Sequence, residues 1–401
     1  MTLSLLAVHQ GGGIGGAPVS LLKLLAALDP AEFQPAAIFT EPGPVTAYAR
    51  DLRVPASVVS TGGAFYYSAH ARLSLRSLAR FVRTFPGAVQ RAQTRLRRER
   101  PDLLHLNTSV LLAWAAAARR ERVPVVWVVR EVLGPSPRLR TWHAGFILRH
   151  ARKVVSISEA VRRCFPADGR VKLVYNTVDL ADFRLDLENE AALVRAEIGL
   201  TPHAHVIMAV GAVQRPKGHW LLLDALARMP DSIHLVLVTG GANATYATSV
   251  RGRVKRALNL PLDNLDALLS DARALDVAER ICVTGFRTDV ARVLAAADVL
   301  VFPSLEPEGF GRPIIEAMAL ARPVVATDVG PSRELLGAEA GVLVPPDPRR
   351  LAAAVTALLG SPDERARMGR AGRARVEACF TLGRQVTAMS AIYHEAAQQS
   401  A

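Results

Sequence analysis

A strand, a glycine-containing loop and a helix follow one another in the stretch that decides the fold, Asp298–Ala319, DVLVFPSLEPEGFGRPIIEAMA. The apolar run Val299–Pro303 predicts a buried strand, and Pro313, with its fixed φ, predicts the start of a helix. Glu308 lies in the loop, and we expect Glu316 in the first helical turn. A helix N-terminus attracts anions, and carboxylates accept hydrogen bonds from hydroxyls. The stretch therefore predicts a site for a ligand with both phosphate and hydroxyl groups, although Glu316 alone fits simple dipole stabilisation, worth roughly 0.3–1 kcal/mol.

A basic loop lies upstream, after the apolar run His205–Val210. Arg215 and Lys217 stand two residues apart between Gly211 and Gly218. Such a loop can place positive charge and hydrogen-bond donors beside a diphosphate. A surface basic turn is the plainer interpretation of these residues taken alone.

The rest of the chain alternates short apolar runs with helical stretches in two blocks. The strands expected in the first block are Leu3–Val8, Ala36–Thr40, Leu103–Asn107, Val123–Val129 and Val154–Ile157. Those expected in the second are His205–Val210, Ile233–Val238, Ile281–Thr284, Val299–Pro303 and Pro323–Ala326. This alternation predicts two α/β domains with parallel sheets. The polar stretch Tyr175–Thr201 is expected to separate them, and Asn243–Glu279 is expected to be an insertion, most simply a solvated helical excursion.

A glycine loop follows the first expected strand. Gly11, Gly13 and Gly16 satisfy G-x-G-x-x-G, and Glu41 follows the second strand where a ribose-binding acid would stand in a dinucleotide site. Glycines also let strand and helix pack tightly. From this loop alone, NAD binding and contact with a sugar or nucleotide are equally good interpretations.

Composition limits the class of protein. The chain has 401 residues, of which 50% are hydrophobic and 21% charged, values typical of a globular protein of two or three domains. Its three cysteines are far apart and fit a reducing cytoplasm. No apolar stretch reaches the roughly 20 residues of a membrane-spanning helix, and the N-terminus lacks the basic segment of a signal peptide. A formal net charge of +13 predicts an anionic partner.

The motifs together resemble the donor site of family 4 retaining glycosyltransferases with the GT-B fold. The E-x7-E block of Glu308 and Glu316 carries the resemblance. It is joined by RPVVATDVG from Arg322, SISEAVR from Ser156, YNTVD from Tyr175 and GFRxDV from Gly285. The resemblance covers essentially the whole chain.

The resemblance implies two Rossmann-like, doubly wound parallel-sheet domains that face a cleft. We expect residues 1–180 to form the acceptor-binding domain, completed by a crossing helix at 385–401, and residues 181–384 to form the donor-binding domain. Lys217, Arg215 and the loop at Gly211 would bind the donor diphosphate, which Gly15 and Gly16 approach from the other domain. The resemblance assigns the remaining donor contacts to the ribose partner Glu316 and to the residues around the transferred sugar: Glu308, Gly309, Phe310 and Gly311.

Two departures from the family pattern concern catalysis. The family arginine often follows the first glycine of the basic loop, where this chain has Ala212; Arg215 is the expected substitute. Many members carry a histidine on a strand-end loop of the first domain, where this chain has Arg130 and Glu131. We expect both to line the cleft, with Asn107 as a lesser candidate. The chain has no Asp-x-Asp and no His/Cys cluster, so we expect transfer without a metal or other cofactor.

A basic amphipathic segment lies in the first block. Arg72, Arg76, Arg80 and Arg83 recur on one helical face with apolar residues elsewhere. We favour docking to an anionic membrane surface over an ordinary solvated face, because like charges at i,i+4 destabilise a helix that has no partner. No nucleic-acid motif accompanies the arginines.

The sequence thus predicts a cytoplasmic retaining glycosyltransferase, peripheral at the inner face of the cell membrane. It would move a sugar from a nucleotide diphosphate to a glycan or lipid-linked acceptor in surface polysaccharide or glycolipid synthesis. The alternatives are an NAD-dependent oxidoreductase that uses the N-terminal glycine loop, a sugar-nucleotide epimerase, and a catalytically silent nucleotide-sugar-binding protein.

Overall fold

The chain divides into two compact units. The computed structural model describes residues 2–69, 74–201, 203–239 and 265–398. The first unit consists of Met1–Thr177, Glu308–Phe310 and Phe380–Ala401, and the second of Val178–Pro307 and Gly311–Cys379. The units meet after residues 177 and 379, whereas the expected domain boundaries lie after residues 180 and 384.

A parallel sheet forms the centre of the first unit, in the strand order β3-β2-β1-β4-β5-β6-β7. Its strands are β1 (Leu3–His9), β2 (Phe33–Phe39), β3 (Ala56–Val58), β4 (Leu103–Leu106), β5 (Val125–Val129), β6 (Lys153–Ser156) and β7 (Val171–Leu173). Every residue of β4 and β5 is buried. Helices cover both faces of such a sheet, so its central strands are continuous apolar runs instead of alternating ones.

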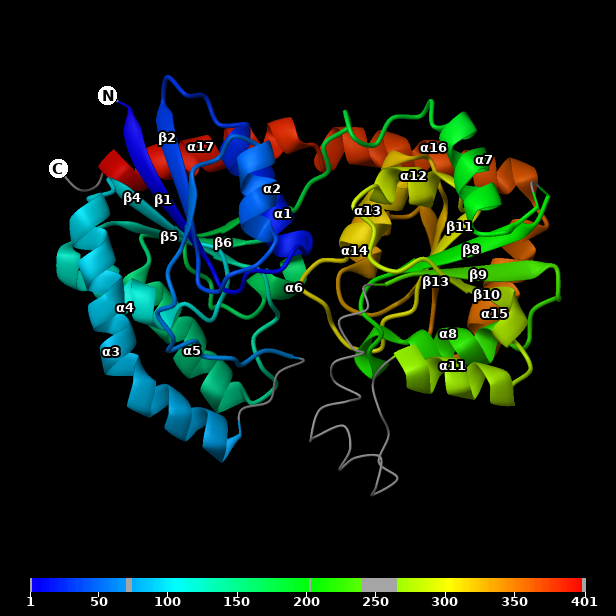
Figure 1. The fold of residues 1–401 in the computed structure, drawn as a ribbon, viewed down its shortest axis with the longest axis horizontal. Helices are drawn as coiled ribbons and strands as arrows, with labels where there is room; N and C mark the ends of the chain where they lie inside the picture. The colour runs from blue at the N-terminus through cyan, green and yellow to red at the C-terminus, as the bar shows by residue number, and fades with distance from the viewer. Residues whose placement is uncertain (1, 70–73, 202, 240–264, 399–401) are drawn as a thin grey trace. The chain divides into compact units, whose positions relative to one another are not determined.

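The helices of the first unit lie on the two faces of this sheet (Figure 1). They are α1 (Gly16–Ala26), α2 (Val45–Asp51), α3 (Leu75–Glu99), α4 (Leu112–Glu121), α5 (Pro137–His150), α6 (Glu159–Arg162) and α17 (Leu382–Gln398). The chain moves outward from β1 in one direction through α1 and α2, and from β4 in the other through α4 and α5. Because crossovers are right-handed, opposite directions place the helices on opposite faces. Helix α3 packs beside α4, and α17 beside α1.

The second unit repeats this plan in the strand order β10-β9-β8-β11-β12-β13, again all parallel. Its strands are β8 (His205–Val210), β9 (Ile233–Val238), β10 (Ile281–Val283), β11 (Val299–Phe302), β12 (Val324–Thr327) and β13 (Gly341–Val344). Its helices and 3-10 turns are α7 (Glu188–Glu197), η1 (Arg215–Lys217), α8 (His219–Leu226), α11 (Leu265–Ala274), η2 (Ala278–Arg280), α12 (Val290–Ala295), α13 (Arg312–Ala319), α14 (Ser332–Leu336), α15 (Pro348–Leu359) and α16 (Pro362–Cys379). Figure 1 shows α8, α11 and α15 on one face of the sheet and α12, α13 and α14 on the other.

Each sheet has one point where the strand order reverses. It lies between β1 and β4 in the first unit and between β8 and β11 in the second. Ligands of open α/β sheets bind outside the carboxyl ends of the strands at this switch point. The loops that follow β1, β4, β8 and β11 are therefore the positions at which a site is expected.

The predicted fold class of two Rossmann-like parallel-sheet domains is confirmed. The short strands β3, β7 and β13 were not predicted, and neither were the helices α2, α5, α6, α14 and α16. Helix α7 lies inside the stretch expected to be a separating segment, and two acids in its first turn, Glu188 and Glu190, suit a helix N-terminus. Of the expected insertion, residues 243–264 lie outside the described residues, and α11 accounts for much of the rest.

Helix α17 belongs to the first unit. Its Tyr393 is fully buried, and the phenol lies 2.6 Å from His105 Nδ1 in β4. Glu395 pairs with Lys153 of β6, and Gln385 accepts a 2.8 Å hydrogen bond from Thr177. Within the described residues, no helix combines the length and apolar character needed to cross a bilayer.

Candidate functional site

The glycine loop after β1 has two parts. Gly11 has a φ of +100°, and a Cβ on Gly12 would meet the carbonyl oxygen of Glu41 at 2.3 Å, so these glycines serve close packing of two loops. Gly13 and Gly15 face open space, and Gly15 begins α1 without a side-chain cap. The amides at the start of α1, which include Gly16, are thus available to an anion. Glu41 accepts a 3.1 Å hydrogen bond from Gln10.

A buried polar network lies at the carboxyl ends of β1, β4 and β5 in the first unit. Asn107 is at its centre: its Nδ2 lies 3.0 Å from His9 Nδ1, and its Oδ1 accepts a 2.7 Å hydrogen bond from Arg130 Nε. Arg130 also donates to Asn176 Oδ1 at 2.7 Å. Arg130, expected on a strand-end loop, is 8% exposed and joins three separate segments of the chain. Asn107 and Arg130 were expected at the cleft, and Asn176 belongs to the YNTVD motif, but His9 was not expected as a site residue.

The two histidines of this network are neutral in the folded protein. Burial, together with the nearby charge of Arg130, lowers the pKa of His9 to about 3 and that of His105 to about 3. His105 Nε2 lies 3.3 Å from Asn107 Oδ1, and its other ring nitrogen meets Tyr393. The network therefore presents one fixed cation, Arg130, among neutral partners.

These pKa values predict that the protein loses stability in mild acid. At pH values between the usual histidine pKa of 6.5 and the folded pKa of about 3, each histidine is protonated in the unfolded chain but not in the folded protein. Stability then falls by about 1 kcal/mol per pH unit for each histidine as pH drops below about 6.5. Urea unfolding at about pH 7 and about pH 5 measures the loss.

Two histidine variants control this experiment. His105→Gln removes one of the titrating groups and is expected to flatten the pH slope, whereas His203→Gln, at an exposed position, leaves the slope unchanged. Glu131 acts in the opposite sense, because burial raises its pKa and its contribution is lost as pH rises. An identical slope in wild type and His105→Gln would show that the buried histidines do not control acid stability.

Glu131 is turned toward backbone amides. Its Oε2 accepts hydrogen bonds from the N–H groups of Ser109 at 2.9 Å and Arg130 at 3.3 Å. The carboxylate thus ties the end of β5 to the loop after β4. Although adjacent in sequence, Arg130 and Glu131 engage different parts of the first unit.

Two loops interlock at the switch point of the second unit. Pro216 O accepts a 2.8 Å hydrogen bond from the Leu305 N–H, and a Cβ on Gly218 would lie 1.8 Å from Pro303 O. Gly218 has a φ of +73° and begins α8. The basic loop after β8 and the loop after β11 are therefore held together by backbone contacts that leave no room for a side chain at position 218.

Lys217 lies beside Gly211 in this arrangement. The Lys217 Nζ is 4.0 Å from the position that a Cβ on Gly211 would take, and Gly211 has a φ of +140°. The sequence prediction placed both residues at one site, and the structure brings them together at the switch point. A compact cation beside an open backbone is suited to a phosphate group.

Arg215 points to an aromatic ring. Its guanidinium carbon lies 4.3 Å from the centre of the Trp220 ring, and Trp220 donates a 2.7 Å hydrogen bond to Asp271 of α11. The cation–π contact gives Arg215 a partner on α8. Trp220 was not expected at this site, because no spacing rule links it to Arg215.

Glu316 is paired with an arginine of its own helix. Helix α13 begins at Arg312 and has no acid in its first turn, so the prediction that Glu316 lies in that turn was wrong. Both Arg312 Nε and Nη2 donate to Glu316 Oε1, at 2.9 and 2.7 Å. Within the described part of the chain nothing bonds Oε2, although the side chain is only 9% exposed. The arginine fixes the carboxylate and leaves one oxygen for a ligand hydroxyl.

The segment Glu308–Phe310 groups with the first unit. Ser158 Oγ donates a 2.7 Å hydrogen bond to Gly309 O, and a Cβ on Gly309 would lie 1.9 Å from Arg130 O. The Phe310 ring lies 6.3 Å from Tyr175 and 6.2 Å from Phe380. Gly311, at a φ of +106°, begins α13 in the second unit.

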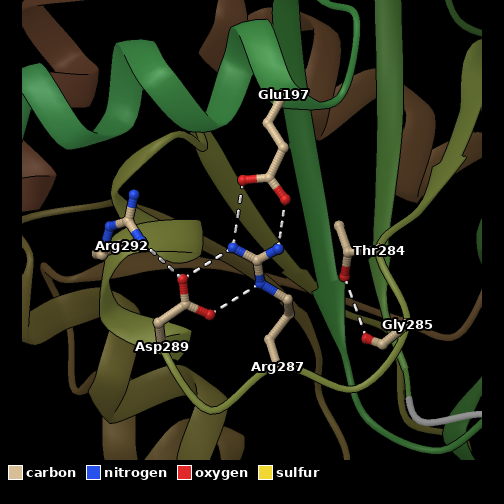
Figure 2. A network of polar contacts seen from close by, with 6 residues as sticks. All are labelled: Glu197, Thr284, Gly285, Arg287, Asp289 and Arg292. Carbon is tan, nitrogen blue, oxygen red and sulfur yellow. Dashed lines mark hydrogen bonds and ion pairs between the residues drawn. The ribbon is translucent and has the colours of Figure 1, made fainter.

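The GFRxDV motif forms an ionic clamp after β10. Arg287 donates to Asp289 twice at 2.8 Å and to both oxygens of Glu197 in α7, and Asp289 also meets Arg292 at 3.2 Å (Figure 2). The two carboxylates raise the pKa of Arg287. The charged residues of the motif therefore hold the loop after β10 in place, while Phe286 stays 55% exposed.

No group of three or more His, Cys, Asp or Glu side chains that could hold a metal ion occurs among the residues with described positions.

Comparisons with known proteins agree with this architecture. The model described as Glycosyltransferase Family 4 matches residues 14–182, and that described as Glycosyl transferases group 1 matches residues 204–361. The Anabaena protein HepE, solved with UDP and glucose, has a TM-score of 0.77 at 22% identity, over 97% of this chain and 98% of HepE. At 22% identity, the match to HepE shows a likeness in fold alone.

Two curated relatives share shorter stretches. A D-inositol 3-phosphate glycosyltransferase of Mycolicibacterium gilvum is 35% identical over 164 residues, 40% of this chain and 32% of the relative. An alpha-maltose-1-phosphate synthase of Mycobacterium tuberculosis is 30% identical over 261 residues, 61% of this chain and 64% of the relative. The match thus spans less than two thirds of either relative. Since the two family models cover most of both units, the chain belongs to glycosyltransferase family 4.

Proposed function

We propose that the protein transfers a sugar, with retention of configuration, from a nucleoside diphosphate donor to a glycan or lipid-linked acceptor in surface polysaccharide or glycolipid synthesis. The observation that carries the proposal is the switch point of the second unit. There Lys217 lies over Gly211, and Glu316 in the adjacent α13 keeps one oxygen available. The cation suits the donor diphosphate, and the carboxylate suits the ribose hydroxyls.

The other donor contacts follow the family pattern. Glu308 and the amides of Gly309–Gly311 would meet the transferred sugar, and the amides at Gly15 and Gly16 would meet the diphosphate. Phe310 would support this loop through its ring contacts. Arg215 is proposed as a secondary diphosphate contact, because its guanidinium already lies over the Trp220 ring.

The proposed reaction needs no protein nucleophile and no metal. The bond between the anomeric carbon and the diphosphate oxygen breaks as the acceptor hydroxyl attacks from the same face. The leaving phosphate takes the acceptor proton, and Lys217 stabilises the charge that develops on it. Arg130 and Glu131 would shape the acceptor side of the site.

The acceptor class has one alternative with support. The names of both curated relatives include a phosphorylated compound, D-inositol 3-phosphate in one and maltose 1-phosphate in the other. A small phosphorylated acceptor is therefore the second acceptor to test. We place the enzyme in the cytoplasm at the inner face of the membrane, with the exposed Arg76, Arg80 and Arg83 of α3 toward the lipid; Arg72 lies outside the described residues.

A silent nucleotide-sugar-binding protein is the second candidate function. It is favoured by the residues Arg130 and Glu131, which stand where many family members have a histidine. Release of nucleoside diphosphate in the presence of donor and acceptor distinguishes the enzyme from the binding protein. Membership of both units in glycosyltransferase models removes the reason for an NAD-dependent oxidoreductase.

A thermal-shift screen tests the donor site. Nucleoside diphosphates and their sugars, UDP-glucose first, are compared with NAD and NADP. A true donor at a hundred times its dissociation constant adds about 2.7 kcal/mol of stability. Glu316→Gln is expected to weaken donor binding by roughly 10- to 100-fold, because it removes a charge-assisted hydrogen bond to the ribose and unpairs Arg312.

Glu279→Gln is the matched control, since Glu279 is exposed on η2 away from the switch point. Its shift with the donor should equal that of the wild type. Stabilisation by NAD alone, unchanged in Glu316→Gln, would contradict the proposed donor site.

A further inference from the structure

Helix α3 consists of two halves with different surroundings, separated at Pro86. All of its buried residues lie in the second half: Ala88, Val89, Ala92 and Leu96. Three of the four arginines of that half contact other residues of the first unit. Arg91 donates to Thr61 O, Arg95 pairs with Glu99 at 2.9 Å, and Arg97 pairs with Glu121 at 2.9 Å. This half is an ordinary helix packed on its own unit.

The first half exposes an apolar stripe. Leu75, Leu78 and Val82 recur at i, i+3 and i+7 on one side of the helix and are 87%, 38% and 62% exposed. An amphipathic helix of a globular protein normally buries such a stripe against its core. Here the described residues leave it uncovered.

The same half carries arginines without ionic partners. Among the described residues no carboxylate pairs with Arg76, Arg80 or Arg83, which lie at i, i+4 and i+7 beside the apolar stripe. Arg76 is also in the first turn, where a cation opposes the helix dipole, and no acid offsets it. An anionic partner would relieve both the repulsion among the arginines and the unfavourable placement of Arg76.

Helix α5 carries two further exposed apolar side chains. Trp142 is 44% and Leu139 37% exposed. The Trp142 ring lies 5.4 Å from Phe65, which also lies 5.1 Å from Phe81 of α3, so Phe65 links the two helices. Figure 1 shows the first half of α3 next to α5. We call Leu75, Leu78, Val82, Leu139 and Trp142, with the three flanking arginines, the α3–α5 face.

We propose that the α3–α5 face docks on a lipid surface of net negative charge, with its leucines, valine and tryptophan in the acyl boundary and its arginines at the headgroups. Apolar side chains flanked by cations form the pattern of an interfacial helix. A second copy of the chain would bring like-charged arginines together, and nucleic acid would leave the apolar stripe without a partner. The proposal gives residues and an insertion mode to the membrane location proposed above, but it does not depend on transfer chemistry.

Vesicle binding by the full chain tests the proposal. Phosphatidylcholine vesicles with and without phosphatidylglycerol are sedimented with wild type and two triple variants. One is Leu75→Ser, Leu78→Ser, Val82→Ser; the other is Arg76→Gln, Arg80→Gln, Arg83→Gln. Wild type is expected to bind only the anionic vesicles and to be released by salt. Each triple variant is expected to bind roughly 100-fold more weakly.

The matched control removes the same charge from the second unit, by Arg228→Gln, Arg349→Gln and Arg350→Gln, all at exposed positions. It should bind vesicles like the wild type. Equal loss in the control would show a general effect of net charge and overturn the proposal, as would serine variants that bind unchanged. Concentration-dependent dimerisation that the serine variants abolish would identify a second copy as the occupant instead. Donor-induced stabilisation, measured on the same variants, should remain as in wild type, so failure of docking is distinguishable from failure of the donor site.

Discussion

Lys217→Ala is expected to lower kcat by about 100- to 1,000-fold while the protein stays folded. The lysine lies beside Gly211 at the reversal point of the second sheet, where the leaving diphosphate is proposed to bind. Its charge is needed most as the glycosidic bond breaks, because negative charge on the phosphate then increases. Initial rates of nucleoside diphosphate release measure the effect. Arg215→Ala should have a smaller effect, because its guanidinium already lies over Trp220.

Lys172→Ala provides the control, since Lys172 is an exposed lysine of the first unit. It should leave kcat unchanged. If Lys217→Ala retained wild-type kcat with equal thermal stability, the proposed role of Lys217 would have to be abandoned. A rise in KM at unchanged kcat would mean that the lysine binds the ground state and the transition state equally well.

Gly218→Ala is expected to destabilise the protein by about 2–4 kcal/mol and to abolish donor-induced stabilisation. Two costs combine at this position. The residue has a φ of +73°, which disfavours any Cβ, and the added carbon would lie 1.8 Å from Pro303 O. Because that oxygen is backbone, the collision is relieved only if the basic loop and the loop after β11 move apart. Urea unfolding and the donor thermal shift measure the two consequences.

Gly199→Ala separates these costs. Gly199 has a similar φ of +74° but nothing within 4 Å of its added Cβ. It should lose only about 1–2 kcal/mol, the cost of the left-handed conformation, and keep its response to the donor. Equal losses in the two variants would mean that contact with Pro303 does not matter.

The framework of the fold was predictable because buried parallel strands appear in sequence as apolar runs. All ten strands expected from the sequence are present, with ends that differ by up to three residues. The three-residue strands β3 and β7 carry too few apolar positions to stand out. Helix α16 has a polar surface and few buried residues, so its sequence shows little periodicity.

Glu316 and Lys217 were named from short motifs, each contained in one loop and the start of the next helix. The pairing of Glu316 with Arg312 was not predicted, although the two residues stand four apart on a helix. The network around Asn107 depends instead on the pairing of β1 with β4, which sets Ala7 opposite His105. It also depends on Tyr393, 288 residues away from His105 along the chain. No local pattern contains such a pairing.

The route of the chain also determines when each unit is able to finish folding. Helix α17, which supplies the phenol that meets His105, follows the whole second unit in sequence. During synthesis on a ribosome, the second unit would therefore have nearly all of its residues before the first unit receives its last helix. Until α17 is synthesised, the first unit would have an uncovered polar group, His105, in β4. The docking of α17 closes a loop that contains the whole second unit, and the entropy cost of closing a loop grows only slowly with its length. The usual N-to-C order of domain completion is thus expected to be reversed in this chain.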